Sequence, residues 1–227
     1  MILTRLFLNG ASRDVQRCIG DAHHLHARVM SMYPPGQGRE PREKLGILHR
    51  LEVSEREGTI VLLVQSPTAP ALESLPAGFL DPRAGDEASA AKSLDVLHGL
   101  LSKGARLRFR LRANPARKID TKTGADGVRR NGRRVPLRGD EARVAWLARK
   151  LRDSGLRLVV EGGSMLVVQR PEGLSRGRRN GLEITHEAHV FEGVVEVDDP
   201  ALAWAAVQKG IGPGKAFGFG LLSLAGA

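Results

Sequence analysis

The chain has 227 residues, of which 41% are hydrophobic, so it is long enough for one large domain or two small ones. Lysine and arginine number 35 against 25 acidic residues, and the formal charge of +10 favours a polyanion such as nucleic acid, although a generally basic proteome gives the same balance. The single cysteine, Cys18, excludes a disulfide framework and a multi-cysteine metal site, and no run approaches the ~20 apolar residues of a membrane span.

We expect a cytoplasmic protein with no membrane partner. A single cysteine suits a reducing compartment. The arginines near the N-terminus resemble those of a transit peptide, but Asp14, Asp21 and an initial strand argue against one.

In the first half of the chain, the hydrophobic pattern predicts a strand over Ile2–Leu8. An amphipathic helix is expected to follow from about Arg13 to Met30, with Ser12 as its N-cap. A loop rich in proline, glycine and charge follows this helix. The other elements expected in this half are strands Ile47–Val53 and Thr59–Gln65, a short helix Ala71–Leu75 and a fourth strand Leu94–Leu101.

The second half opens on the clearest strand pattern, Arg106–Arg112, where leucine and phenylalanine alternate with arginine. A helix is expected over Glu141–Asp153 with Asp140 as N-cap, and a last helix starts at Asp199-Pro200 and ends at Gly210. The remaining expected strands are Leu156–Val160, Met165–Gln169, Ala188–Val197 and Phe219–Leu224.

Each half therefore follows the order β-α-β-β-α-β. This order predicts an α+β fold of two tandem ferredoxin-like (RRM-like) domains, residues 1–101 and 102–227. Helices cover one face of each such sheet and leave the other for a ligand. Arg108, Arg110 and Arg112 are therefore candidate RNA contacts, and a solvated strand face is the alternative.

Three histidines, His23, His24 and His26, lie on the first expected helix, where His23 and His26 share a face. A metal site is disfavoured because no carboxylate or further histidine at helical spacing completes it. An imidazole can instead move protons near neutral pH. RNA cleavage by its own 2′-hydroxyl needs only a base and an acid, and it yields a 2′,3′-cyclic phosphate and a 5′-hydroxyl. The alternative is a histidine without function.

The other histidines, His49, His98, His186 and His189, show no usable pairing and are expected to be structural or exposed. No paired-carboxylate pattern is present, which disfavours a two-metal nuclease.

Residues 210–220 hold five glycines, and such bare backbone can approach phosphate oxygens closely. Gly212, Gly214 and Lys215 are the candidate phosphate contacts. The segment is not a P-loop, because Lys215 is followed by no serine or threonine and precedes a strand. A tight turn is the alternative.

Further basic groups predict contacts to an RNA stem, with a solvated loop as the alternative. Low aromatic content, 4%, favours a duplex over stacked single-stranded bases. The candidates in these groups are Arg143 on the helix and Arg170, Arg176, Arg178 and Arg179 in an expected hairpin, and Arg129, Arg130, Arg133 and Arg134 form another group.

Four stretches together resemble the CasE family, the CRISPR-associated repeat-processing endoribonucleases of type I-E systems. They are Leu3–Asn9 with Ala11–Asp14, Leu107–Pro115, Val144–Leu151 and Gly210–Leu224, and Phe191-Glu-Gly also fits. The likeness runs from end to end of the chain.

The resemblance implies tandem ferredoxin-like domains and cleavage of the CRISPR repeat at the base of its stem-loop, without a cofactor. It also implies that the enzyme stays bound to the mature crRNA and joins the other Cascade subunits. The family's catalytic histidine falls on His26. Some members have an assisting tyrosine three residues earlier, where this chain has His23, so which residue is base and which is acid stays open.

The resemblance further implies that the glycine-rich turn and Lys215 hold the backbone near the scissile phosphate, and that Arg170–Arg179 enters the major groove of the stem. Two other function classes stay open. One is a non-catalytic stem-loop-binding subunit, and the other is a metal-dependent nuclease.

Overall fold

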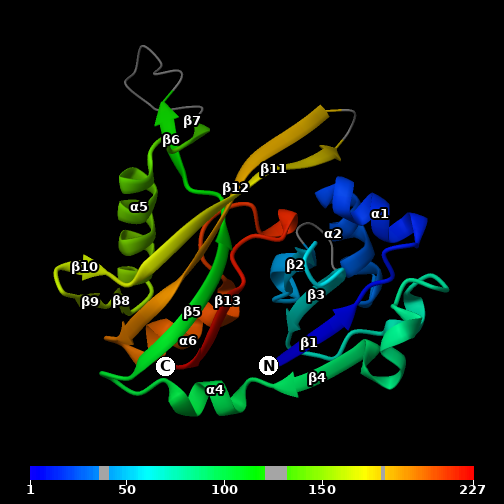
Figure 1. Ribbon diagram of the computed structural model, residues 1–227, viewed down its shortest axis with the longest axis horizontal. Coiled ribbons are helices and arrows are strands. Elements are labelled where there is room, and N and C mark those ends of the chain that lie inside the picture. The colour runs from blue at the N-terminus through cyan, green and yellow to red at the C-terminus, as the bar shows by residue number, and fades with distance from the viewer. Residues whose placement is uncertain (36–40, 121–131, 180–181) are drawn as a thin grey trace.

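The computed structural model describes residues 1–35, 41–120, 132–179 and 182–227, in which two large antiparallel sheets lie side by side (Figure 1). The first sheet has the order β2-β3-β1-β4. Its strands are β1 (Ile2–Phe7), β2 (Leu48–Ser54), β3 (Thr59–Ser66) and β4 (Ser89–Ser93). Helices α1 (Arg13–Gly20) and α2 (Ala22–Ser31) pack against it over a core that includes Leu6, Val15, Leu25, Val29 and Leu62.

The second sheet has the order β11-β12-β5-β13, and β8 also pairs with β12. Its strands are β5 (Arg106–Ala113), β8 (Leu156–Leu158), β11 (Val167–Arg179), β12 (Leu182–Val197) and β13 (Leu222–Gly226). Helices α5 (Asp140–Arg152) and α6 (Pro200–Lys209) supply Leu147, Leu151, Ala203 and Val207 to its core. Both strand orders are those of the predicted ferredoxin-like fold, which is confirmed.

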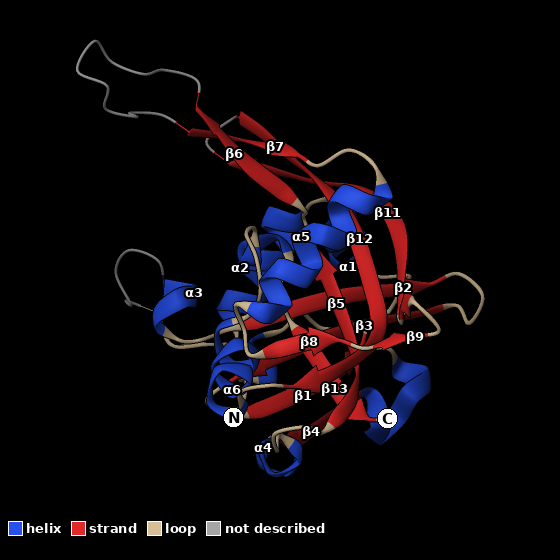
Figure 2. Ribbon diagram, turned by 90° about the vertical axis from the view of Figure 1, so that its left-hand side faces the viewer, coloured by secondary structure: helices blue, strands red, loops and turns tan. Residues whose placement is uncertain are grey.

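Smaller elements complete the described chain. They are α3 (Pro41–Lys44), η1 (Leu72–Ser74), η2 (Pro82–Ala88), α4 (Asp95–Leu100), β6 (Ala116–Asp120), β7 (Gly132–Pro136), β9 (Val160–Glu161), β10 (Ser164–Met165) and η3 (Lys215–Phe217). The β6–β7 hairpin and the turn end of the β11–β12 hairpin project at one end of the molecule (Figures 1 and 2). Within the described ranges, no helix is long and apolar enough to cross a membrane.

The predicted fourth strand over Leu94–Leu101 is wrong. The fourth strand is β4, whose Ser93 pairs with Ile2, and α4 follows it. Leu94, Leu97 and Leu101 are buried at helical spacing, and they pack into the core of the second sheet. The division of the chain at residues 101 and 102 stays a prediction.

Three predicted helix starts meet different outcomes. The single helix Arg13–Met30 is broken at Asp21, whose extended backbone ends α1 and starts α2. Ser12 occupies the N-cap position of α1 without a side-chain cap hydrogen bond, and Gly139 rather than Asp140 precedes α5. The cap at Asp199 is confirmed, because its carboxylate accepts hydrogen bonds from the backbone N–H groups of Ala201 and Leu202.

The arginine face of β5 is partly covered by the first sheet. Arg110 lies 3.5 Å from the carboxylate of Glu52 on β2. Arg50 of β2 is buried and donates hydrogen bonds to the Leu221 carbonyl at 3.1 Å and to the Ser223 hydroxyl at 3.0 Å. Part of the arginine face of β5 therefore contacts the first sheet, and the part around Arg106 and Arg108 is exposed.

Candidate active site

The start of α2 positions two of the predicted histidines. The carboxylate of Asp21 accepts hydrogen bonds from the backbone N–H groups of His23 and His24 at 2.8 and 3.2 Å. His23 and His26 then lie about one helical turn apart, with ring centroids separated by 6.5 Å. Both side chains are half-buried, so they are held by their surroundings yet reachable from solvent.

The glycine-rich turn meets this helix beside β11. A β-carbon built on Gly177 of β11 would lie 2.8 Å from Cε1 of Phe217 in η3 and 3.1 Å from the backbone nitrogen of His23. Only a glycine allows the strand, η3 and α2 to approach so closely. The structure therefore brings the histidines of the opening helix beside the C-terminal turn, as the proposed chemistry requires.

Three glycines shape that turn. Gly214 and Gly218 flank η3 in the left-handed region, with φ of 79° and 76°. Gly212 packs against Trp146, since a β-carbon there would lie 3.2 Å from the indole ring. Lys215 is half-buried, and burial together with the nearby charge of Arg42 lowers the pKa of its ammonium group.

His49 was missed by the sequence reasoning. Its ring is fully buried behind His26, and the two ring centroids lie 6.0 Å apart. A β-carbon on Gly218 would lie 3.6 Å from Nε2 of His49. Burial, and then the proximity of His26, lower the pKa of His49 to about 3, so the ring is neutral. No sequence signal links residues 26 and 49, because their contact exists only in the folded chain.

Arg112 anchors the turn from β5. Its guanidinium donates to Glu172 at 2.6 Å and to the Phe217 carbonyl at 3.2 Å, and it lies 4.5 Å from the centre of the Phe219 ring. The cation therefore holds η3 in place beside the histidines.

Most other predicted arginines have partners within the protein. Arg110 pairs with Glu192 at 3.2 Å, and Arg108 donates to the Gly226 carbonyl. Arg143 pairs with Asp140, and Arg170 pairs with Glu192, both at 3.0 Å.

The expected basic hairpin is confirmed, because Arg170–Arg179 lies in β11, which pairs antiparallel with β12. Arg176 and Arg178 are exposed on this strand, and Arg176 lies 3.8 Å from Glu183. The side chain of Arg179 lies outside the described residues, as do Arg129 and Arg130 and the side chain of Arg133.

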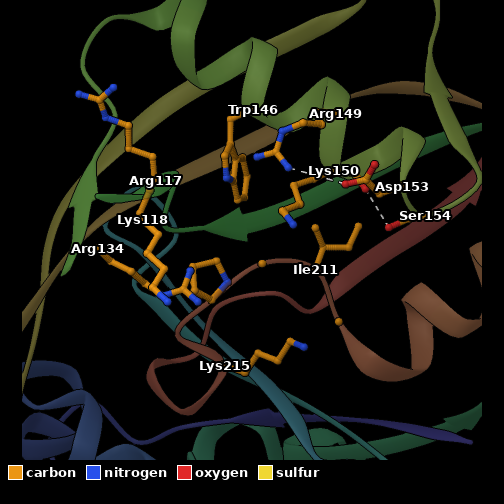
Figure 3. Close-up of a pocket in the computed structure, with 14 residues that line it drawn as sticks. Arg117, Lys118, Arg134, Trp146, Arg149, Lys150, Asp153, Ser154, Ile211 and Lys215 are labelled. Atoms are coloured by element: carbon orange, nitrogen blue, oxygen red, sulfur yellow. Dashed lines mark hydrogen bonds and ion pairs between the residues drawn. The ribbon is translucent and has the colours of Figure 1, made fainter. Parts of the chain in front are cut away.

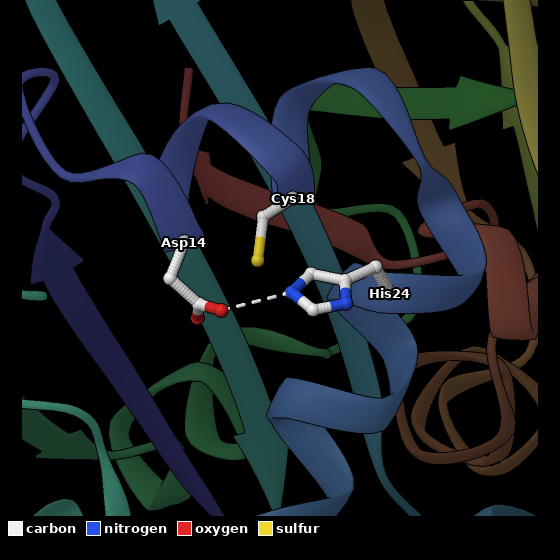
Figure 4. Close-up of side chains that lie close together, drawn as sticks. All are labelled: Asp14, Cys18 and His24. Carbon is white, nitrogen blue, oxygen red and sulfur yellow. Dashed lines mark hydrogen bonds and ion pairs between the residues drawn. The ribbon is translucent and has the colours of Figure 1, made fainter.

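A possible ligand cluster joins α1 and α2. Asp14, Cys18 and His24 bring one ligand atom each to within 4.8 Å of one another (Figure 4). Arg28, however, makes a two-pronged ion pair with the same Asp14 carboxylate, at 2.9 and 3.1 Å. A divalent ion there would face a neighbouring positive charge, and burial raises the pKa of the Cys18 thiol to about 12. The cluster thus fits an ion-pair network better than a metal site.

Comparisons with known proteins identify the family. Residues 1–226 match the family model described as CRISPR associated protein. The CRISPR-associated endoribonuclease Cse3 of Thermus thermophilus is 37% identical over 99% of this chain and all of that protein. A Cse3 structure bound to a 19-nucleotide RNA has a TM-score of 0.80 at 33% identity, over 99% of this chain and 100% of that one. The Escherichia coli Cas6e structure has a TM-score of 0.65 at 26% identity, over the full length of both chains. The chain belongs to the CRISPR-associated protein family that contains the endoribonuclease Cse3 and the Cascade subunit CasE.

Proposed function

We propose that this protein is the endoribonuclease that cleaves CRISPR precursor RNA within the repeat, at the base of the stem-loop. The 2′-hydroxyl attacks the adjacent phosphate, and the products carry a 2′,3′-cyclic phosphate and a 5′-hydroxyl. The observation that carries this proposal is that the start of α2, the helix that bears His23 and His26, meets η3 of the glycine-rich turn at Gly177 of β11.

In this mechanism, His26 exchanges a proton with the reacting RNA. The histidine pair can supply a base for the 2′-hydroxyl and an acid for the leaving 5′-oxygen, because each imidazole can hold or release a proton near neutral pH. Lys215 and the backbone of Gly212 and Gly214 hold the phosphate. The exposed Arg176 and Arg178 contact the stem.

The activities and assemblies of related proteins support this assignment. The Thermus relative is named an endoribonuclease, and one of its structures, 33% identical to this chain, holds an RNA representing a pre-cleavage complex. The Escherichia coli relative is named a Cascade subunit, and a chain 26% identical to this one belongs to a CRISPR RNA-guided surveillance complex. We therefore propose that this protein retains the mature crRNA and joins a Cascade assembly in the cytoplasm.

The test compares His26→Ala with His98→Ala under single-turnover conditions. His98 lies on α4 against Trp204, away from the histidine pair, so it controls for loss of a histidine. Affinity is measured on an RNA whose nucleotide at the cut has no 2′-hydroxyl and therefore cannot react.

We expect His26→Ala to slow cleavage by at least about 10²-fold, with nearly unchanged affinity. Equal cleavage by both variants, or loss of affinity together with cleavage, would refute the role of His26. A wild-type protein that binds the RNA and never cuts it would instead be a non-catalytic stem-loop binder.

A further inference from the structure

A strongly basic pocket of about 570 Å³ adjoins the glycine-rich turn. Its walls come from β6, β7, α5 and the turn itself (Figure 3). Six cationic side chains line it: Arg117, Lys118, Arg134, Arg149, Lys150 and Lys215. Asp153 is the one acidic residue among the described residues that line it.

Most of this charge is not neutralised by the described part of the chain. Among the described residues that line the pocket, one ion pair forms, between Arg149 and Asp153 at 3.7 Å. The side chains of Lys150 and Lys215 extend into the same space from α5 and from the turn, and Lys118 and Arg134 approach it from the β6–β7 hairpin (Figure 3). Like charges gathered in this way repel one another, so the arrangement favours an anionic ligand.

The pocket and the candidate active site share η3. Lys215 starts this short helix and lines the pocket, whereas Phe217 ends it against Gly177 and α2. A 3₁₀ helix rises about 2 Å per residue, so the two ends are about 4 Å apart along its axis. The pocket and the candidate active site are therefore adjacent along one short helix.

We infer that this pocket binds the backbone phosphates of the same RNA strand immediately beside the cut, a contact that rests on the proposed function. The lining favours backbone over base recognition, because Trp146 is buried against Gly212 and offers no open face for stacking. The ligand chemistry is therefore that of backbone phosphodiesters, held by lysine and arginine without regard to sequence.

The experiment uses the full-length double variant Lys118→Gln with Lys150→Gln. Its matched control, Lys92→Gln with Lys103→Gln, removes the same charge at exposed positions outside the pocket. Both are assayed for affinity on the uncleavable RNA across a range of salt concentrations. Single-turnover cleavage at saturating enzyme is measured on the normal RNA.

We expect the pocket variant to bind about tenfold more weakly near 0.15 M salt, with a salt slope reduced by about 1.5, as two lost phosphate contacts imply. The control variant should lose much less affinity. At saturating enzyme, the cleavage rate of both variants should stay within about threefold of wild type.

A second measurement locates the contact. Uncharged methylphosphonate linkages replace the RNA phosphates one at a time, and each RNA is tested against wild type and the pocket variant in a double-mutant cycle. We expect coupling at one to three consecutive linkages next to the cut.

Coupling at no linkage, coupling only far from the cut, or unchanged affinity of the pocket variant would overturn the inference. These outcomes leave cleavage by wild type intact, so they are distinct from failure of the proposed function. A wild-type protein that neither binds nor cuts the RNA would refute both.

Discussion

The imidazole rings of His26 and His49 are stacked, with centroids 6.0 Å apart and 25° between their planes. His49 is the second residue of β2 and is fully buried, whereas His26 is half-buried on α2. Because the pKa of His49 is lowered to about 3, chiefly by burial, this ring does not carry a charge that would compete with protonation of His26. His49 is thus placed to position the His26 ring without exchanging protons itself.

We predict that His49→Phe makes the protein less sensitive to acid. In the folded state, the pKa of His49 lies below the ordinary value of 6.5. Between about pH 6.5 and about 3 the unfolded chain therefore binds an extra proton, and stability falls as pH falls, by up to about 1.4 kcal/mol per unit. The free energy of unfolding, measured with denaturant at several pH values, should decline less steeply for His49→Phe over this window. His98→Phe should follow wild type, and parallel curves for all three proteins would contradict the prediction.

Asp21 and Asp199 form a matched pair of helix caps. Both have φ of −136° and ψ of 107°, and each carboxylate accepts two backbone N–H groups of the following helix. Replacement of either by alanine should lower the free energy of unfolding by about 1 kcal/mol. Only Asp21→Ala should also slow cleavage, by roughly tenfold, because its cap sets the position of His23. Equal cleavage rates for the two variants at matched folded fraction would show that the cap has no part in the reaction.

Gly177→Ala tests the junction of β11, η3 and α2. The added methyl group would lie 2.8 Å from Phe217 and must move either η3 or the strand, at a cost of about 1–3 kcal/mol in stability. Cleavage should fall more than affinity, since the displaced elements carry the reacting groups. Gly99→Ala is the control, because it lies in α4 with open space around it and should be neutral or slightly stabilising. An active Gly177→Ala protein of normal stability would disprove the close contact.

Local patterns were enough to predict much of this fold. The alternation in Arg106–Arg112 predicted β5, and Asp199-Pro200 predicted the start of α6. The order of elements predicted both sheets. These features depend on neighbours in sequence, where the physical rules for strands, caps and turns apply directly.

The errors arose where distant segments decide the structure. The run Leu94–Leu101 is apolar enough for a strand, but its leucines are buried at helical spacing by the second sheet. The packing of His49 against His26 and the pairing of Arg110 with Glu52 are tertiary contacts, which no periodicity reveals.

Product retention should limit the enzyme to one rapid turnover. A surface with many phosphate contacts releases its product slowly, so release rather than chemistry sets the steady rate. With RNA in excess, we expect a burst of product equal to the enzyme concentration, followed by a slow phase that higher salt accelerates. Continued fast turnover at low salt would count against retention of the crRNA.

The most direct measurement incubates the protein with an end-labelled repeat stem-loop in excess EDTA and identifies the chemical ends of the products. We predict cleavage at undiminished rate, a 2′,3′-cyclic phosphate on the upstream fragment and a 5′-hydroxyl on the downstream one. Loss of cleavage in EDTA, or a 5′-phosphate on the downstream fragment, would contradict a reaction carried by the 2′-hydroxyl and the histidines of α2.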